Sequence, residues 1–112
     1  MNPSQVGEAL ESQIENLESL IGEVRKAGLD AATCEANYKT AFSKARLTIR
    51  ATSLDRPTVD QVTDEATVQC EEIYLQHLVA QNYLMSVRES IRLAQTKVDA
   101  LRSLLATFRA VG

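Results

Sequence analysis

The segment Thr52-Ser53-Leu54-Asp55-Arg56-Pro57 decides the fold, because it is the only cluster of turn-forming residues in a chain whose pattern is otherwise helical. The stretches on either side contain no internal proline. We therefore predict a single all-α domain over residues 1–112. Its first helical arm covers residues 3–52, a tip covers residues 53–57, and its second arm covers residues 58–110. Arms joined by so short a tip lie antiparallel, so the prediction is a long helical hairpin.

Capping signals mark the start of each arm. Thr58 is followed three residues later by Gln61, which is the spacing of a capping box. Asn2 followed by Pro3 also suits a helix start, because asparagine is a good N-cap and proline is tolerated in the first turn. Both signals support the predicted arms.

Mostly apolar residues recur along both arms at alternating spacings of four and three residues, and we call these positions the seam. In the second arm the seam comprises Val59, Thr63, Ala66, Cys70, Ile73, His77, Ala80, Leu84, Val87, Ile91, Ala94, Val98, Leu101, Leu105 and Phe108. In the first arm it comprises Leu10, Ile14, Leu17, Ile21, Val24, Gly28, Ala31, Glu35, Tyr38, Phe42, Ala45 and Ile49. This sustained heptad pattern predicts coiled-coil-like packing of the arms.

Gly28 raises the question of whether the first arm is one helix or two. The heptad phase is the same before and after Gly28, and a turn at this point would have no reason to preserve it. We therefore favour one long helix that allows a kink or break near Gly28. A three-helix bundle with a turn at this glycine is the alternative.

Folding the arms back about the tip pairs residues whose numbers add up to roughly 111 or 112. The pairs in this register are Glu35 with His77, Tyr38 with Tyr74, and Ala45 with Ala66. Glu35 and His77 are the most polar seam residues, so we expect them to form a structural pair that fixes the register. A proton switch or a ligand at His77 is the alternative interpretation of the chain's single histidine.

The sequence does not favour catalysis or metal binding. The two cysteines, Cys34 and Cys70, lack the paired spacing of a zinc site or a redox motif. Patterns typical of phosphate-binding loops, dinucleotide-binding folds and zinc proteases are absent. We therefore expect no enzyme activity, no metal and no cofactor. Without a signal peptide or an apolar run of about 18 residues, we also expect a cytoplasmic protein with reduced thiols and no membrane contact.

Large apolar residues remain outside the seam. They are Leu20, Leu29, Leu47, Leu75, Val79, Leu93, Leu104 and Val111. Two helices bury only one seam between them, so contiguous burial of these side chains needs other subunits. We therefore predict a homo-oligomer.

Charge is segregated along the chain, whose formal net charge is −3. Residues 1–37 are acidic, whereas residues 38–56 are basic. A chain of this net charge binds a polyanion only through a local basic patch, and the candidate patch comprises Lys39, Lys44, Arg46 and Arg50. In the alternative, these cations are neutralised by acids on the opposing arm, namely Asp60, Asp64, Glu65, Glu71 and Glu72.

The segment Lys44-Ala45-Arg46-Leu47 resembles the Lys-Ala-Arg-Leu-Asp-Tyr motif of phage recombination mediator proteins of the UvsY type. A Tyr-Lys-Thr-Ala-Phe stretch precedes it at residues 38–42, and a long second arm follows. The lysine and arginine of the motif are present. Thr48 and Ile49 stand where the family has Asp and Tyr, so the family's aromatic residue has no counterpart at this position.

The resemblance implies a homo-oligomer, ring-like in shape, that binds single-stranded DNA in the cytoplasm of a phage-infected bacterial host. It also implies two protein partners, a recombinase and the single-strand-binding protein that the recombinase displaces. A structural or scaffolding coiled coil that binds only other proteins is the alternative function, because it would show the same heptads. For base stacking, Tyr83 is the candidate, since we expect Tyr38 and Tyr74 in the core.

Overall fold

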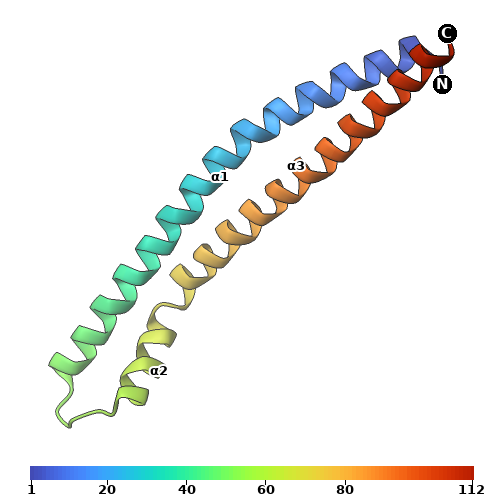
Figure 1. The fold of residues 1–112 in the computed structure, drawn as a ribbon. Coiled ribbons are helices and arrows are strands. Elements are labelled where there is room, and N and C mark those ends of the chain that lie inside the picture. The colour runs from blue at the N-terminus through green and yellow to red at the C-terminus, as the bar shows by residue number, and fades with distance from the viewer. The chain divides into compact units, whose positions relative to one another are not determined.

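The computed structural model describes residues 1–112 and consists of helices without strands (Figure 1). The helices are α1 (Pro3–Thr52), α2 (Val59–Gln69) and α3 (Glu71–Val111). The predicted all-α class is confirmed. The chain forms two compact units, of which one contains residues 1–27 with 84–112 and the other contains residues 28–83.

Both predicted helix starts are confirmed by reciprocal hydrogen bonds. At the start of α1, the Gln5 backbone N–H donates to Asn2 Oδ1 at 2.9 Å, and the Asn2 backbone N–H donates to Gln5 Oε1 at 3.0 Å. At the start of α2, Thr58 and Gln61 form the predicted capping box, with bonds of 3.1 and 2.9 Å. These bonds satisfy N–H groups that a helix start leaves without intrahelical partners.

The first helix is continuous from Pro3 to Thr52, so the turn at Gly28 that a three-helix bundle would need does not occur. The end of α1 is satisfied by two side chains. The Ser53 hydroxyl donates to the Ile49 carbonyl at 2.6 Å, and the Thr52 hydroxyl donates to the Thr48 carbonyl at 2.8 Å. Such bonds satisfy carbonyl groups near a helix end, and α1 ends at Thr52, where the predicted tip begins.

The second arm is not one helix, which corrects the prediction of a single arm over residues 58–110. Cys70, with φ −99° and ψ 12°, separates α2 from α3, and the chain changes direction there (Figure 1). The interruption is local, because the Cys70 N–H still donates to the Ala66 carbonyl and the Tyr74 N–H to the Cys70 carbonyl. No glycine or proline marks this break in the sequence, and nothing in the structure explains why it falls at this residue.

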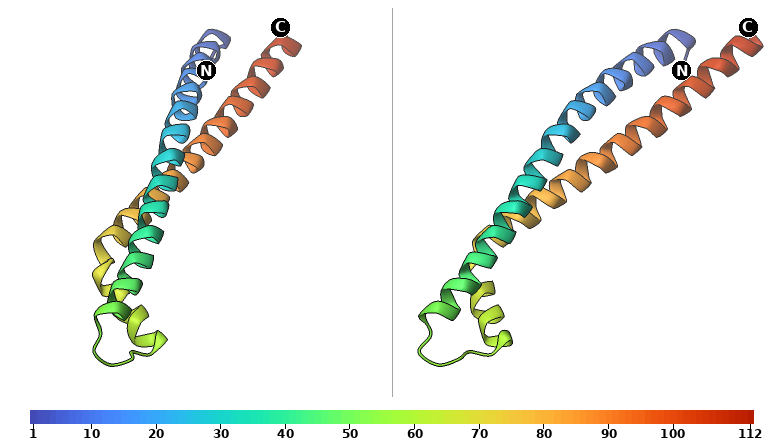
Figure 2. Two further views of the ribbon diagram at one scale, coloured as in Figure 1. Left: turned by 90° about the vertical axis from the view of Figure 1, so that its left-hand side faces the viewer. Right: turned by 60° about the vertical axis from the view of Figure 1, so that its left-hand side comes forward.

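The unit of residues 28–83 is a helical hairpin with its apolar core near the tip. Ile49 of α1 packs against Val62 and Ala66 of α2, and Phe42 and Ala45 are packed against this cluster. Figures 1 and 2 show α2 beside the last turns of α1. Ala45 packs against the cluster that contains Ala66, which agrees with the predicted register. Further along, the ring centroids of Tyr38 and Tyr74 lie 4.9 Å apart, which confirms the predicted register at this level.

The exposure of two valines of α2 differs from the predicted seam. Val59, predicted in the seam, is 63% exposed, whereas Val62, outside it, is only 1% exposed. Val59 is the first residue of α2, and the register places it opposite the last residues of α1, so little helix surface is available to cover it. Val62 lies one turn further in, where Ile49 covers it.

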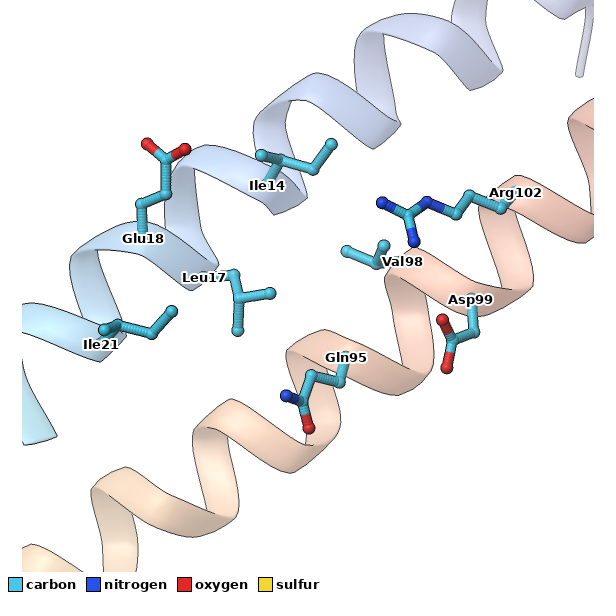
Figure 3. Close-up of a pocket in the computed structure, with 8 residues that line it drawn as sticks. All are labelled: Ile14, Leu17, Glu18, Ile21, Gln95, Val98, Asp99 and Arg102. Atoms are coloured by element: carbon cyan, nitrogen blue, oxygen red, sulfur yellow. The ribbon is translucent and has the colours of Figure 1, made fainter.

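The unit of residues 1–27 and 84–112 pairs the beginning of α1 with the end of α3. Its buried side chains are Val6, Ala27, Val87, Ala94 and Val98. A groove of about 510 Å³ runs between the helices, lined by Ile14, Leu17, Glu18, Ile21, Gln95, Val98, Asp99 and Arg102. Figure 3 shows Leu17 and Val98 pointing into this space from opposite helices, while Glu18 points away from it. Some seam residues of this unit are thus partly open to solvent, among them Ile21, which is 40% exposed.

Candidate nucleic-acid interface

The four predicted cations lie on α1 within the unit of residues 28–83, but they do not share one face. Lys39, Arg46 and Arg50 are spaced by seven and four residues, which places them within about 40° of each other around the helix. Lys44 lies about 160° from Arg46 by the same geometry. The two cations of the Lys44-Ala45-Arg46-Leu47 motif therefore flank the seam from opposite sides.

Lys39 is paired within its own helix. Its Nζ lies 3.0 Å from Glu35 Oε1, and both side chains are largely exposed. This hydrogen bond and the positive charge of Lys39 lower the pKa of Glu35, with a smaller contribution from His77. The i,i+4 spacing of the two residues is a sequence signal for this ion pair, although such exposed pairs contribute little to stability.

Arg46 is the most constrained of the cations. It is half-buried, and its guanidinium carbon lies 5.9 Å from the centroid of the Phe42 ring, one turn earlier on α1. Its Nε is buried without a hydrogen-bond partner. Stacking on a ring fixes the plane of a guanidinium and leaves its terminal nitrogens available to an acceptor. Arg46 thus combines a ring contact within its own helix with a guanidinium that has no carboxylate partner.

The acids of α2 and α3 do not neutralise the patch through ion pairs. The ion pairs of the structure join Glu35 with Lys39 and Glu89 with Arg92, each within one helix. Lys44 and Arg50 are exposed, and neither they nor Arg46 lie within ion-pair distance of a carboxylate. Three of the four predicted cations thus carry unpaired charge.

Aromatic rings form a cluster beside these cations. The Tyr38 ring stacks on His77 with centroids 5.7 Å apart and planes 5° apart, and it contacts Phe42 at 5.9 Å and Tyr74 at 4.9 Å. Glu35 forms its ion pair with Lys39. His77 lies near enough to Glu35 to contribute to the lowering of its pKa, but the expected direct pair between them is not formed. His77 Nδ1 is buried without a hydrogen-bond partner.

Tyr74 differs from the sequence-based expectation, because 43% of its surface is exposed. Its partner Tyr38 is half-buried, as a core residue should be. The heptad pattern contains a signal for this difference, since Tyr38 lies in the seam and Tyr74 directly follows the seam residue Ile73. Tyr83, the tyrosine that sequence reasoning assigned to stacking, is exposed to a similar extent, at 45%.

The comparisons with protein-family models, with curated proteins and with solved structures found no match. No group of three or more potential metal ligands occurs in the structure, and both cysteines are free. None of the helices combines the length and the hydropathy needed to cross a bilayer. What the interface offers is unpaired positive charge beside aromatic rings.

Proposed function

We propose that the chain is a single-stranded DNA-binding recombination mediator that helps to load a recombinase onto the strand. The observation that supports this proposal is the unpaired charge of Lys44, Arg46 and Arg50 in a chain whose net charge is −3. Cations without carboxylate partners can bind phosphates without first breaking an ion pair. The resemblance of the Lys44-Ala45-Arg46-Leu47 segment to the mediator motif points in the same direction.

Assembly compensates for the small size of the patch. One protomer offers only a few phosphate contacts, but a homo-oligomer repeats them along one strand and gains avidity. The side chains available for subunit contacts are large and apolar. Leu29, Leu47, Leu75 and Val79 are exposed in the unit of residues 28–83, and Leu93 and Val111 are exposed in the other. We also propose two protein partners, namely the recombinase and the single-strand-binding protein that it displaces. The proposed location is the cytoplasm of a phage-infected bacterium.

The experiment that tests the proposal is a titration of a labelled single-stranded oligonucleotide at several salt concentrations. The test variant is Lys44→Ala/Arg46→Ala. The matched control is Arg88→Ala/Lys97→Ala, which removes the same charge from exposed positions of α3 in the other unit. We expect salt-dependent binding by the wild-type protein and the control, with log affinity falling by roughly 0.7 per phosphate contact per tenfold increase in salt.

Two outcomes would contradict the proposal. In the first, a folded, assembled wild-type protein does not bind the oligonucleotide. In the second, the test variant and the control lose the same affinity, which would show that binding follows net charge and not the patch. Circular dichroism of each variant shows whether its helices are retained.

The exposed apolar side chains also favour a second candidate function, a scaffold that binds only other proteins. Leu29 and Leu47 are 69% and 65% exposed, and they lie five turns apart on the same side of α1. A scaffold tolerates Lys44→Ala/Arg46→Ala but loses assembly with Leu29→Ser/Leu47→Ser. A mediator loses strand affinity with the first variant and keeps its assembly.

A further inference from the structure

Tyr74 is the exposed ring of the aromatic cluster, and the cluster holds it in place. Its centroid lies 4.9 Å from Tyr38 and 6.2 Å from His77. Tyr38 is itself fixed by its parallel stack with His77 and by its contact with Phe42. A ring supported in this way loses little conformational freedom when a ligand stacks on its open side.

The cluster connects Tyr74 to the cations of α1. Phe42, which contacts Tyr38, also lies under the Arg46 guanidinium. Lys39 directly follows Tyr38 in the chain. A continuous set of contacts therefore runs from the exposed ring on α3 to Arg46 on α1.

Helix handedness places Tyr74 and these cations on the same side of the hairpin. Lys39, Arg46 and Arg50 each directly follow a seam residue of α1, and Tyr74 directly follows the seam residue Ile73 of α3. In an antiparallel pair of right-handed helices, positions one residue after the seam line the same side of both helices. Lys44 precedes Ala45, so it lies on the other side.

We propose that Tyr74 stacks on an unpaired base of the bound strand while Arg46 and Arg50, which have no carboxylate partner, hold its phosphates, and that this ring makes the interface select single strands over duplex. The inference rests on the proposed function. The preference for single strands follows from base stacking, because every unpaired base presents a face on which an aromatic ring can stack. In a duplex both faces are already stacked, and exposing one requires unstacking.

The chain contains no tryptophan, so a tryptophan placed at the site is a single reporter. The test variant is Tyr74→Trp, and the matched control is Tyr83→Trp. Tyr83 is exposed to the same degree, but it lies nine residues from Tyr74, which is the opposite side of α3. We expect a single-stranded oligonucleotide to quench the fluorescence of Tyr74→Trp, duplex of the same length to quench it far less, and Tyr83→Trp to respond to neither.

A second pair of variants measures affinity. Tyr74→Leu should weaken single-strand binding about tenfold, which corresponds to the loss of about one stacked base, and leave duplex binding unchanged. Tyr74→Phe should keep the wild-type preference, because the ring remains. Circular dichroism checks that both variants keep the helices.

The outcomes separate the inference from the function on which it rests. If the wild-type protein binds single strands but Tyr74→Trp is not quenched and Tyr74→Leu keeps its preference, the stacking role of Tyr74 is wrong and the proposed function stands. If the wild-type protein binds no single strand, both are wrong. Equal quenching of Tyr74→Trp and Tyr83→Trp would also overturn the inference, because it would indicate contact without a specific stacking position.

Discussion

Replacing Val62 with alanine tests the core near the tip, because this side chain is the most buried valine of α2. The change removes two methyl-sized groups from a site that is 1% exposed. At about 0.8 kcal/mol for each buried group, the transfer contribution is about 1.6 kcal/mol. A cavity beside Ile49 and Ala66 that does not collapse adds up to about 1 kcal/mol. We therefore expect a loss of about 1.6–2.6 kcal/mol in the free energy of unfolding, from a total of about 5–15 kcal/mol.

Val68→Ala is the matched control for this prediction. It makes the same chemical change in the same eleven-residue helix, at a side chain that is 72% exposed. Both variants gain the helix propensity of alanine over valine, so this effect cancels in the difference between them. The control should change the free energy of unfolding by no more than about 0.5 kcal/mol.

Urea unfolding followed by circular dichroism measures both variants. Val62→Ala should lower the midpoint with little change in slope. Repeating the measurement at several protein concentrations separates subunit contacts from the internal core, because a side chain buried between subunits gives a loss that depends on concentration. If Val62→Ala and Val68→Ala are equally stable at low concentration, the assignment of Val62 to the core is refuted.

Three further predictions concern other parts of the chain. Leu101→Asp, at a half-buried seam position of α3, should lower the free energy of unfolding by several kcal/mol, because it places a charge against apolar side chains. An unchanged melting temperature would contradict the seam in the unit of residues 1–27 and 84–112. Lys39→Ala should raise the pKa of Glu35 towards its ordinary value, which an NMR titration measures. Because Lys39 lowers this pKa in the folded protein, the ion pair stabilises the fold at pH values above the ordinary pKa of Glu35. That stabilisation is lost as the pH falls through the lowered pKa. Glu71 directly follows the seam residue Cys70, so it lies on the Tyr74 side and its charge repels a strand bound there. Glu71→Gln should therefore strengthen single-strand binding at low salt. Equal affinities of the variant and the wild-type protein would argue against a strand on this side.

Local rules predicted much of the fold because they depend on near neighbours. The capping residues Asn2 and Thr58 act within three positions of themselves, so their spacing alone identified both helix starts. The heptad phase likewise decided that α1 continues through Gly28, since a turn would have shifted the seam. The register followed from the tip and was confirmed at Tyr38 with Tyr74.

The remaining features depend on the packing of particular side chains. The break at Cys70 has no local signal, because cysteine neither restricts φ as proline does nor frees it as glycine does. The exchange of Val59 for Val62 in the core depends on where α1 ends relative to the first turn of α2. At the candidate site, sequence identified the cations, but it missed that Lys39 pairs with Glu35 and that Tyr74 keeps an open ring.

The break at Cys70 also affects how the tip holds its structure. An isolated helix as short as α2, with eleven residues, is marginal in water, and it cannot rely on propagation from α3 because Cys70 interrupts the helix. Its order therefore comes from docking Val62 and Ala66 on Ile49. Loss of that contact would release α2 as a unit, so its amide hydrogens would exchange with solvent together, through one local unfolding event, while those in the middle of α3 stay protected.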